Sequence, residues 1–89
     1  MSFVGVVELL EDLIVKQAHC KRGSADANYY DNVRHGVERT LDKLGIDYEY
    51  EDTEDENYPF GIKKITIYDA EFRATEKELK PLTKGANNK

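Results

Sequence analysis

The chain of 89 residues has a single cysteine, Cys20, and no tryptophan. One cysteine excludes an intrachain disulfide, so nothing in the sequence indicates an oxidising compartment. The N-terminal apolar stretch has no basic residues ahead of it and contains Glu8, Glu11 and Asp12, which argues against a signal peptide and against a membrane span. We therefore expect a cytoplasmic protein with no membrane segment.

Motifs for nucleotide binding and catalysis are also missing. The six glycines are scattered, without the spacing of a Walker or dinucleotide fingerprint. The only soft metal ligands or strong nucleophiles are His19, Cys20 and His35, and a structural zinc site needs four ligands at a recognisable spacing. A cysteine–histidine nucleophilic pair would also need an orienting third group and a cleft. We predict no catalytic residue, no metal site and no cofactor.

Negative charge is what the chain has in excess, and it is concentrated in one place. The net charge is −5, from 18 acidic and 13 basic residues. The segment DYEYEDTEDE, residues 47–56, holds seven acids and no base, and the remaining 11 acids and 13 bases sum to +2. A local negative patch can steer a basic partner, whereas an even acidic surface mainly supports solubility.

Residues 3–20 predict a first helix, with Ser2 at its start and Gly23 beyond its end. Its apolar arc spans about 220°, which is wider than one neighbour can cover. In so short a chain this surplus predicts contact with a second copy, so we expect a homodimer. The alternative is that this helix is the central helix of the core. The expected dimer interface comprises Phe3, Val6, Val7, Leu10, Leu13 and Ile14.

Residues 24–45 predict a second helix with one narrow apolar stripe, and the short link predicts an antiparallel helix pair. From residue 46 the period changes to two, which is typical of a half-buried strand, and residues 62–73 predict its antiparallel partner. Thr75 and Glu78 have the spacing of a capping box, and Pro81 would end the short helix that they start.

These elements predict a small α+β domain over residues 1–82. It consists of a two-helix hairpin followed by an antiparallel β-hairpin and a short C-terminal helix. Residues 83–89 have nothing to bury and predict a disordered C-terminal tail.

The acidic segment does not fit a calcium loop. With Asp47 at position 1, an EF-hand would need glycine where Asp52 stands and a bidentate glutamate where Tyr58 stands. Weak binding of divalent ions by the loop carboxylates stays open. The alternation of residues 47–51 has an ordinary explanation, because a half-buried strand has a polar outer face and acids on an edge strand discourage aggregation.

The same acids also form a regularly spaced negative row, which predicts a DNA-mimic-like patch for a basic protein surface. Only Lys64 is expected on the outer face of the partner strand. Tyr48, Tyr50, Tyr58 or Phe60 would supply apolar anchors, and the last two have no obvious core to enter. The expected partner-binding residues are Asp47, Glu49, Glu51, Asp52, Glu54, Asp55, Glu56, Tyr58 and Phe60.

We therefore predict a non-enzymatic protein-binding module, of the accessory or inhibitor type found in phages and mobile elements. One alternative is nucleic-acid binding by basic helix ends such as Lys21 and Arg22 and by the tail, although acids on the second helix argue against a major-groove helix. The other is a divalent-metal-dependent phosphoesterase-type enzyme that uses several of the same carboxylates.

Overall fold

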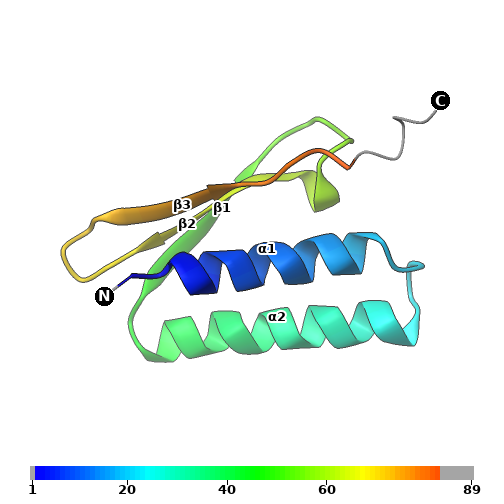
Figure 1. Ribbon diagram of the computed structural model, residues 1–89. Helices are drawn as coiled ribbons and strands as arrows, with labels where there is room; N and C mark the ends of the chain where they lie inside the picture. Colours follow the sequence, from blue (N-terminus) through cyan, green and yellow to red (C-terminus); the bar gives the residue numbers. More distant parts are fainter. Residues whose placement is uncertain (1, 83–89) are drawn as a thin grey trace.

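The computed structural model describes residues 2–82, which form two antiparallel helices followed by a three-stranded antiparallel sheet (Figure 1). The strand order is β1-β2-β3, and a 3-10 turn precedes β2. The α+β class is confirmed, and the predicted tail at 83–89 lies outside the described residues. The elements are α1 (Val4–Ala18), α2 (Ala25–Lys43), β1 (Asp47–Asp52), η1 (Pro59–Gly61), β2 (Ile62–Tyr68) and β3 (Ala74–Glu78).

Local capping signals set the ends of α2. The Ser24 hydroxyl accepts a hydrogen bond from the backbone N–H of Ala27 at 3.1 Å, which satisfies one of the free donors of the first turn. Gly45 follows the helix with a φ of 73°, a left-handed conformation that glycine adopts without steric strain. Among residues 2–82, no helix is both long and apolar enough to cross a membrane.

The alternation of β1 sets its register with β2. Tyr48 lies opposite Ile67, and Tyr50 lies opposite Ile65, on the face that packs on the helices. The acids that alternate with these tyrosines, Asp47, Glu49 and Glu51, are exposed on the other face. The predicted pairing of these two strands is thereby confirmed, with the tyrosines inward and the acids outward.

The predicted C-terminal helix is wrong, because residues 74–78 form β3. Thr75 lies opposite Ile67, and Lys77 lies opposite Ile65, so both face the helices while the residues between them are exposed. The free edge of β2 offers backbone hydrogen bonds to the whole segment, which outweigh a two-residue capping signal. The second predicted strand is correspondingly shorter, since the chain reverses at residues 69–73.

Asp69 fixes this reversal. Its carboxylate accepts hydrogen bonds from the backbone N–H groups of Glu71 at 2.8 Å and Arg73 at 2.9 Å, and from the Arg73 guanidinium at 3.0 Å. The backbone N–H of Arg73 contributes most to holding the pKa of the Asp69 carboxyl below its usual value. A side chain that satisfies two N–H groups stabilises a turn at this point of the sequence.

Phe72 in the same turn is strained. Its φ is 61°, and its side chain is 78% exposed, so little burial offsets the strain. A left-handed conformation costs about 1–2 kcal/mol outside glycine. Because glycine also loses more chain entropy on folding, we expect Phe72→Gly to raise the free energy of unfolding by about 0.5–1 kcal/mol. Urea denaturation measures this change, and Phe72→Ala is the control because it removes the ring but keeps Cβ. An equal gain for Phe72→Ala would contradict the assignment to backbone strain.

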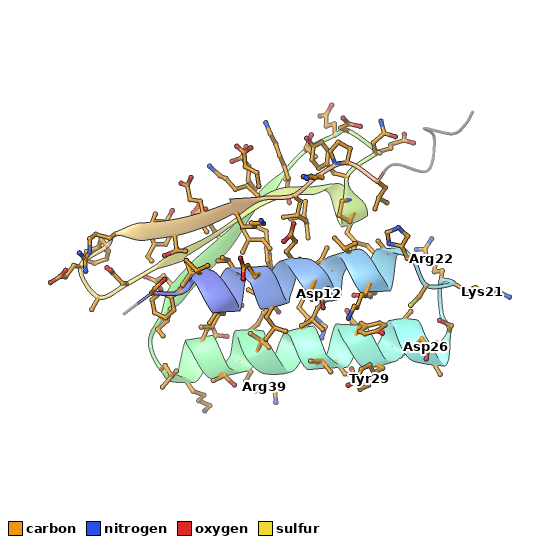
Figure 2. The ribbon with its side chains drawn as sticks, viewed as in Figure 1. Asp12, Lys21, Arg22, Asp26, Tyr29 and Arg39 are labelled. Atoms are coloured by element: carbon orange, nitrogen blue, oxygen red, sulfur yellow. The ribbon has the colours of Figure 1, made fainter. Side chains whose placement is uncertain are left out.

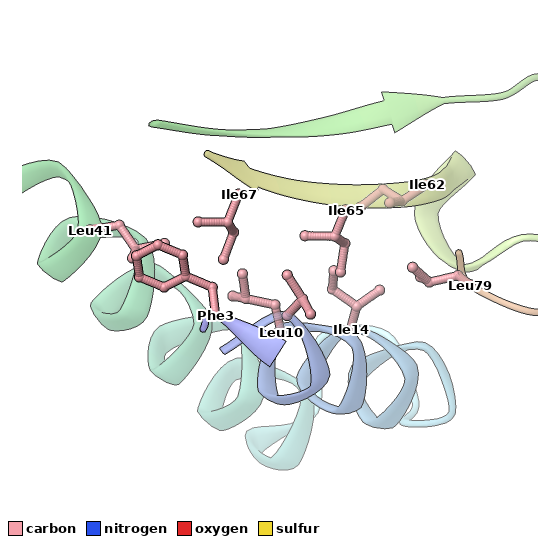
Figure 3. Packing of buried hydrophobic residues seen from close by; sticks show 9 residues of the cluster. Phe3, Leu10, Ile14, Leu41, Ile62, Ile65, Ile67 and Leu79 are labelled. Atoms are coloured by element: carbon pink, nitrogen blue, oxygen red, sulfur yellow. The ribbon is translucent and has the colours of Figure 1, made fainter. Parts of the chain in front are cut away.

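The core lies between the sheet and the helix pair (Figure 3). Leu10 and Ile14 of α1 point toward Ile65 and Ile67 of β2, and Leu41 of α2 closes one end of the cluster. α1 contacts β2 and β3, whereas α2 contacts β1. Both helices therefore cover the same face of the sheet.

This packing changes the basis of the dimer hypothesis. Among the six residues of the expected dimer interface, five are buried within a single chain and Val6 is half-buried. The sheet and α2 cover most of the wide apolar arc of α1, as the central-helix alternative predicts, while Val4 and Leu9 are 50% and 43% exposed. A homodimer stays a prediction, but five of the six residues supply no free surface for it. The buried five are Phe3, Val7, Leu10, Leu13 and Ile14.

Candidate functional site

The face of the sheet that points away from the helices carries two rows of acids. β1 supplies one row and β3 the other, while Lys64, Thr66 and Tyr68 of β2 lie between them. Acids within a row are about 7 Å apart, and the two rows are about 10 Å apart, from the usual spacings within and between strands. The term acidic face is used below for Asp47, Glu49, Glu51, Glu76 and Glu78.

Two lysines of β2 partly neutralise this acidic face. The Lys63 ammonium lies 3.9 Å from the Glu51 carboxylate. The Lys64 ammonium lies 3.4 Å from the Glu51 carboxylate and 3.7 Å from that of Glu76. The hydrogen bond to Glu51, and then the charge of Glu76, raise the pKa of Lys64. The Tyr68 hydroxyl donates to Glu49 at 3.1 Å, which raises the pKa of Tyr68. Five carboxylates against two ammonium groups leave the face negative at neutral pH.

Sequence reasoning found the β1 row and the place of Lys64, but it missed Glu76 and Glu78. Both acids stand in the segment that was predicted as a helix. The alternation of ATEKE, residues 74–78, is the signal that could have found them, since it places three side chains on one face of a strand. The acidic face therefore depends on a third strand, and no local sequence motif predicts this strand.

The acidic segment continues beyond β1 into a loop, residues 52–58, called the acidic loop below. The two ends of this loop are held together by a hydrogen bond from the Thr53 N–H to the Gly61 carbonyl at 2.8 Å. Gly61 has a φ of 69°, and a Cβ there would lie 3.1 Å from the Thr53 carbonyl oxygen, so glycine is required. The Asp55 carboxylate accepts from the Asn57 N–H at 2.9 Å, which gives this acid a structural role within the loop.

The four candidate aromatic anchors differ in exposure. Tyr48, Tyr50 and Tyr58 are half-buried and pack against the core. The expectation that Tyr58 has no core to enter is therefore wrong. Phe60 is 57% exposed and has a φ of 53°, which makes it the exposed aromatic side chain of the expected set.

Tyr50 has a further role beneath the sheet. Its hydroxyl donates to the Glu38 carboxylate, which also accepts from the Arg34 guanidinium at 3.2 Å. Burial, and then the hydrogen bond to Glu38, raise the pKa of Tyr50 well above its usual value. Arg34 also lies 3.4 Å from Asp31. This network links α2 to β1 and ties Tyr50 to the helix layer.

The side chains of both histidines and of the cysteine contact residues four positions earlier in the chain. The His19 ring contacts the Val15 carbonyl at 2.9 Å, and the Cys20 thiol donates to the Lys16 carbonyl at 3.2 Å, both within the same helix end. His35 lies 3.5 Å from Asp31 on α2. Within residues 2–82, no three His, Cys, Asp or Glu side chains converge in a way that could hold a metal ion.

The basic residues named for nucleic-acid binding lie at the link between the helices. Figure 2 shows Lys21 and Arg22 at this end of the molecule, with Asp26 close by on α2. Tyr29 and Arg39 follow along the outer side of the same helix (Figure 2). The bases are therefore separated from the acidic face and interrupted by an acid.

No protein-family model, curated protein or solved structure matches the chain. The charge and geometry described above are therefore the support for a function.

Proposed function

We propose that this chain is a non-enzymatic protein-binding module whose acidic face binds a basic surface on another protein. The observation that carries the proposal is a sheet face with five carboxylates on the two strands that flank β2 and no helix over it. Together with the four acids of the acidic loop and with Lys63 and Lys64, this surface carries −7. The remaining nine acids and eleven bases of the chain carry +2, so the asymmetry is large for so small a protein.

The sheet also holds the charges in fixed positions. Backbone hydrogen bonds pair β1 and β3 with the central strand, so the two rows cannot move independently. A basic partner would therefore meet a preorganised array and lose less conformational entropy than it would on a flexible acidic tail. Such an array accelerates association and selects against acidic proteins.

Charge density argues against a full DNA mimic. A six-residue strand is about 20 Å long, and a duplex of that length carries about 12 phosphate charges. The acidic face offers five carboxylates, less the charges of Lys63 and Lys64. A short basic segment of a partner therefore matches this surface better than a DNA-binding groove that has evolved to contact a duplex.

Neutralising the centre of the face tests the proposal. We expect Glu49→Gln/Glu76→Gln to weaken binding of a fluorescent hexa-lysine peptide by about five- to tenfold at low salt, because two partly exposed charges contribute about 0.5 kcal/mol each or slightly more. Glutamine keeps the shape of both side chains. Fluorescence anisotropy measures the affinity, and binding should weaken further as salt is added.

The control variant is Glu8→Gln/Asp26→Asn, which removes two exposed acids from the helices and gives the same net charge of −3. We expect this variant to bind within about twofold of the wild type, since the removed charges lie away from the sheet face. Equal losses in the two variants would show an effect of net charge alone and would contradict a defined site. A third variant, Glu54→Gln/Glu56→Gln, measures how much the acidic loop contributes to the peptide affinity. Asp55 is left unchanged because its carboxylate accepts the hydrogen bond from the Asn57 N–H.

A further inference from the structure

The helix pair is wider than the three-stranded sheet that it covers. α1 contacts β2 and β3, whereas α2 contacts β1 at the edge of the sheet. Packed helices lie about 8–10 Å apart and neighbouring strands about 4.8 Å apart. With α1 beneath the space between β2 and β3, the axis of α2 lies about 1–3 Å beyond β1. Because a helix is about 10 Å across, α2 also extends beneath a position next to β1 where residues 2–82 place no strand.

The free edge of β1 at this position carries unpaired backbone groups. The hydrogen bond from the Leu79 N–H to the Lys63 carbonyl at 2.8 Å shows that the backbone groups of odd-numbered residues in β2 face β3. Those of even-numbered residues therefore face β1, where their partners are the three acids of the outer row. The N–H and C=O groups of Tyr48 and Tyr50 consequently point away from β2, and no backbone group of residues 2–82 bonds to them. Such groups are a template for pairing with a further strand.

The side chains of β1 indicate which strand fits this edge. Asp47, Glu49 and Glu51 stand about 7 Å apart on the outer face. An antiparallel second copy of β1 would place acids opposite acids, which is destabilising. Basic residues at every second position of an added strand would instead lie opposite the acids, in the non-hydrogen-bonded pairs where side chains approach most closely. On the inner face, the half-buried rings of Tyr48 and Tyr50 leave contact area for apolar side chains.

The free edge of β3 lacks this combination. Its outer face carries two acids, Glu76 and Glu78, and by the same spacing α1 ends before the position outside β3. An added strand there would have no helix beneath its inner face. β1 is therefore the edge that both the charge and the helix layer favour.

We propose that a segment of the basic partner adds to β1 as a fourth, antiparallel strand of the sheet. Lysine or arginine at every second position faces the outer row of acids, and the residues between them bond to the backbone of Tyr48 and Tyr50 above α2. The backbone hydrogen bonds contribute affinity, and the alternating side chains contribute specificity. The inference rests on the proposed function, since it gives the conformation in which the basic segment binds the acidic face.

Amide hydrogen exchange tests the pairing, with acetyl-Lys-Val-Lys-Val-Lys-amide as the probe. Its lysines match the acids of β1, and its valines match Tyr48 and Tyr50. With the peptide at about ten times its dissociation constant, we expect the Tyr48 and Tyr50 amides to exchange about tenfold more slowly, because only about a tenth of the chain is free. The Glu76 and Glu78 amides point to the free edge of β3 by the same alternation, and we expect their exchange to change by less than about twofold.

Methylated peptides separate strand addition from charge attraction. Methyl groups on both valine nitrogens remove the N–H groups that face β1, and we expect an affinity at least about tenfold lower. Methyl groups on the backbone nitrogens of the last two lysines face solvent instead, and we expect an affinity within about threefold of the unmethylated peptide. Both variants have the same charge and the same number of methyl groups. Amide chemical-shift titration of the chain measures all three affinities.

Equal affinities of the two methylated peptides would contradict strand addition. Unchanged exchange of the Tyr48 and Tyr50 amides at saturation would do the same. Slower exchange of the Glu76 and Glu78 amides alone would place the added strand on β3 and overturn the choice of β1.

The hexa-lysine experiment keeps the two proposals separate. If Glu49→Gln/Glu76→Gln weakens hexa-lysine binding but the alternating peptide leaves the two tyrosine amides unprotected, the proposed function stands and this inference fails. If the same substitutions leave the affinities of both peptides unchanged although the tyrosine amides are protected, the edge of β1 accepts a strand but the proposed function fails.

Discussion

Leu10→Ala is expected to lower the free energy of unfolding by about 3–5 kcal/mol, the range for removing a fully buried leucine side chain. Leu10 is 0% exposed and points from α1 toward the sheet, between Ile67 and Ile65 (Figure 3). Truncation removes apolar burial and leaves a cavity that two packed layers cannot easily close. At about 0.05–0.15 kcal/mol per residue, the whole chain is stable by only about 4–13 kcal/mol, so the variant will be partly or largely unfolded.

Leu9→Ala is the matched control for this prediction. Leu9 is the neighbouring residue on the same helix, but it is 43% exposed. We expect it to lower the free energy of unfolding by less than about 1 kcal/mol. Urea denaturation followed by circular dichroism gives both values. Similar losses at the two positions would contradict the orientation of α1 against the sheet.

Local sequence patterns predicted α2 and β1, because the capping residues and the alternation that define them lie within a few residues of each other. Ser24 and Gly45 mark the ends of α2 through their own hydrogen bond and backbone conformation, so a sequence read alone finds them. The alternation around Tyr48 and Tyr50 likewise places β1 with its acids outward. Each of these predictions needs only the period of the element and the chemistry of its caps.

The third strand could not be predicted in this way, and the omission of two acids follows from it. Residues 74–78 carry a weak helix-start signal and a weak alternation, and the free edge of β2 decides between them. β3 and the following Leu79 cover part of the apolar face of α1, while Val4 and Leu9 of this helix are 50% and 43% exposed. Missing β3 therefore produced the omission of Glu76 and Glu78. A helical pattern shows how wide an apolar face is, but not which segment covers it.

A hollow at the link between α1 and α2, lined by Gln17, Glu56 and Phe60 among others, is a further feature that only the tertiary structure shows. Gln17 and Phe60 are 43 positions apart and belong to no common motif. They line the same space because the helix pair and the closed acidic loop end on the same side of the sheet. The acid-rich composition of the loop was visible in the sequence, whereas its position beside the link between the helices was not.

Arg34→Met is the second substitution expected to have a large effect, lowering the free energy of unfolding by about 2–3 kcal/mol. The Arg34 and Glu38 side chains are each 15% exposed, and Arg34 also neutralises Asp31. Without the guanidinium, the Glu38 carboxylate stays largely buried with the Tyr50 hydroxyl as its donor. Removing one partner of a fully buried pair costs about 3–5 kcal/mol, and the remaining solvent contact reduces that figure here.

A second substitution separates charge from packing. Arg34→Met/Glu38→Gln should recover about half of the loss, because the neutral amide still accepts from Tyr50 and no buried carboxylate remains. Arg39→Met is the control on the outer side of the same helix (Figure 2), with an expected change within about 0.5 kcal/mol. Equal effects of Arg34→Met and Arg39→Met would contradict a stabilising network at this position.

The network also connects stability with the acidic face. Tyr50 points to the helices, whereas its neighbours Glu49 and Glu51 on the same strand point outward. Holding the Tyr50 side chain in place therefore also holds the backbone that orients these two carboxylates. Arg34→Met should therefore weaken hexa-lysine binding even at temperatures where the variant is fully folded. Arg34 lies beneath the sheet and is itself positive, so loss of a repelling charge alone would strengthen binding. A weaker affinity in the folded variant would identify the network as the part of the structure that positions the β1 row.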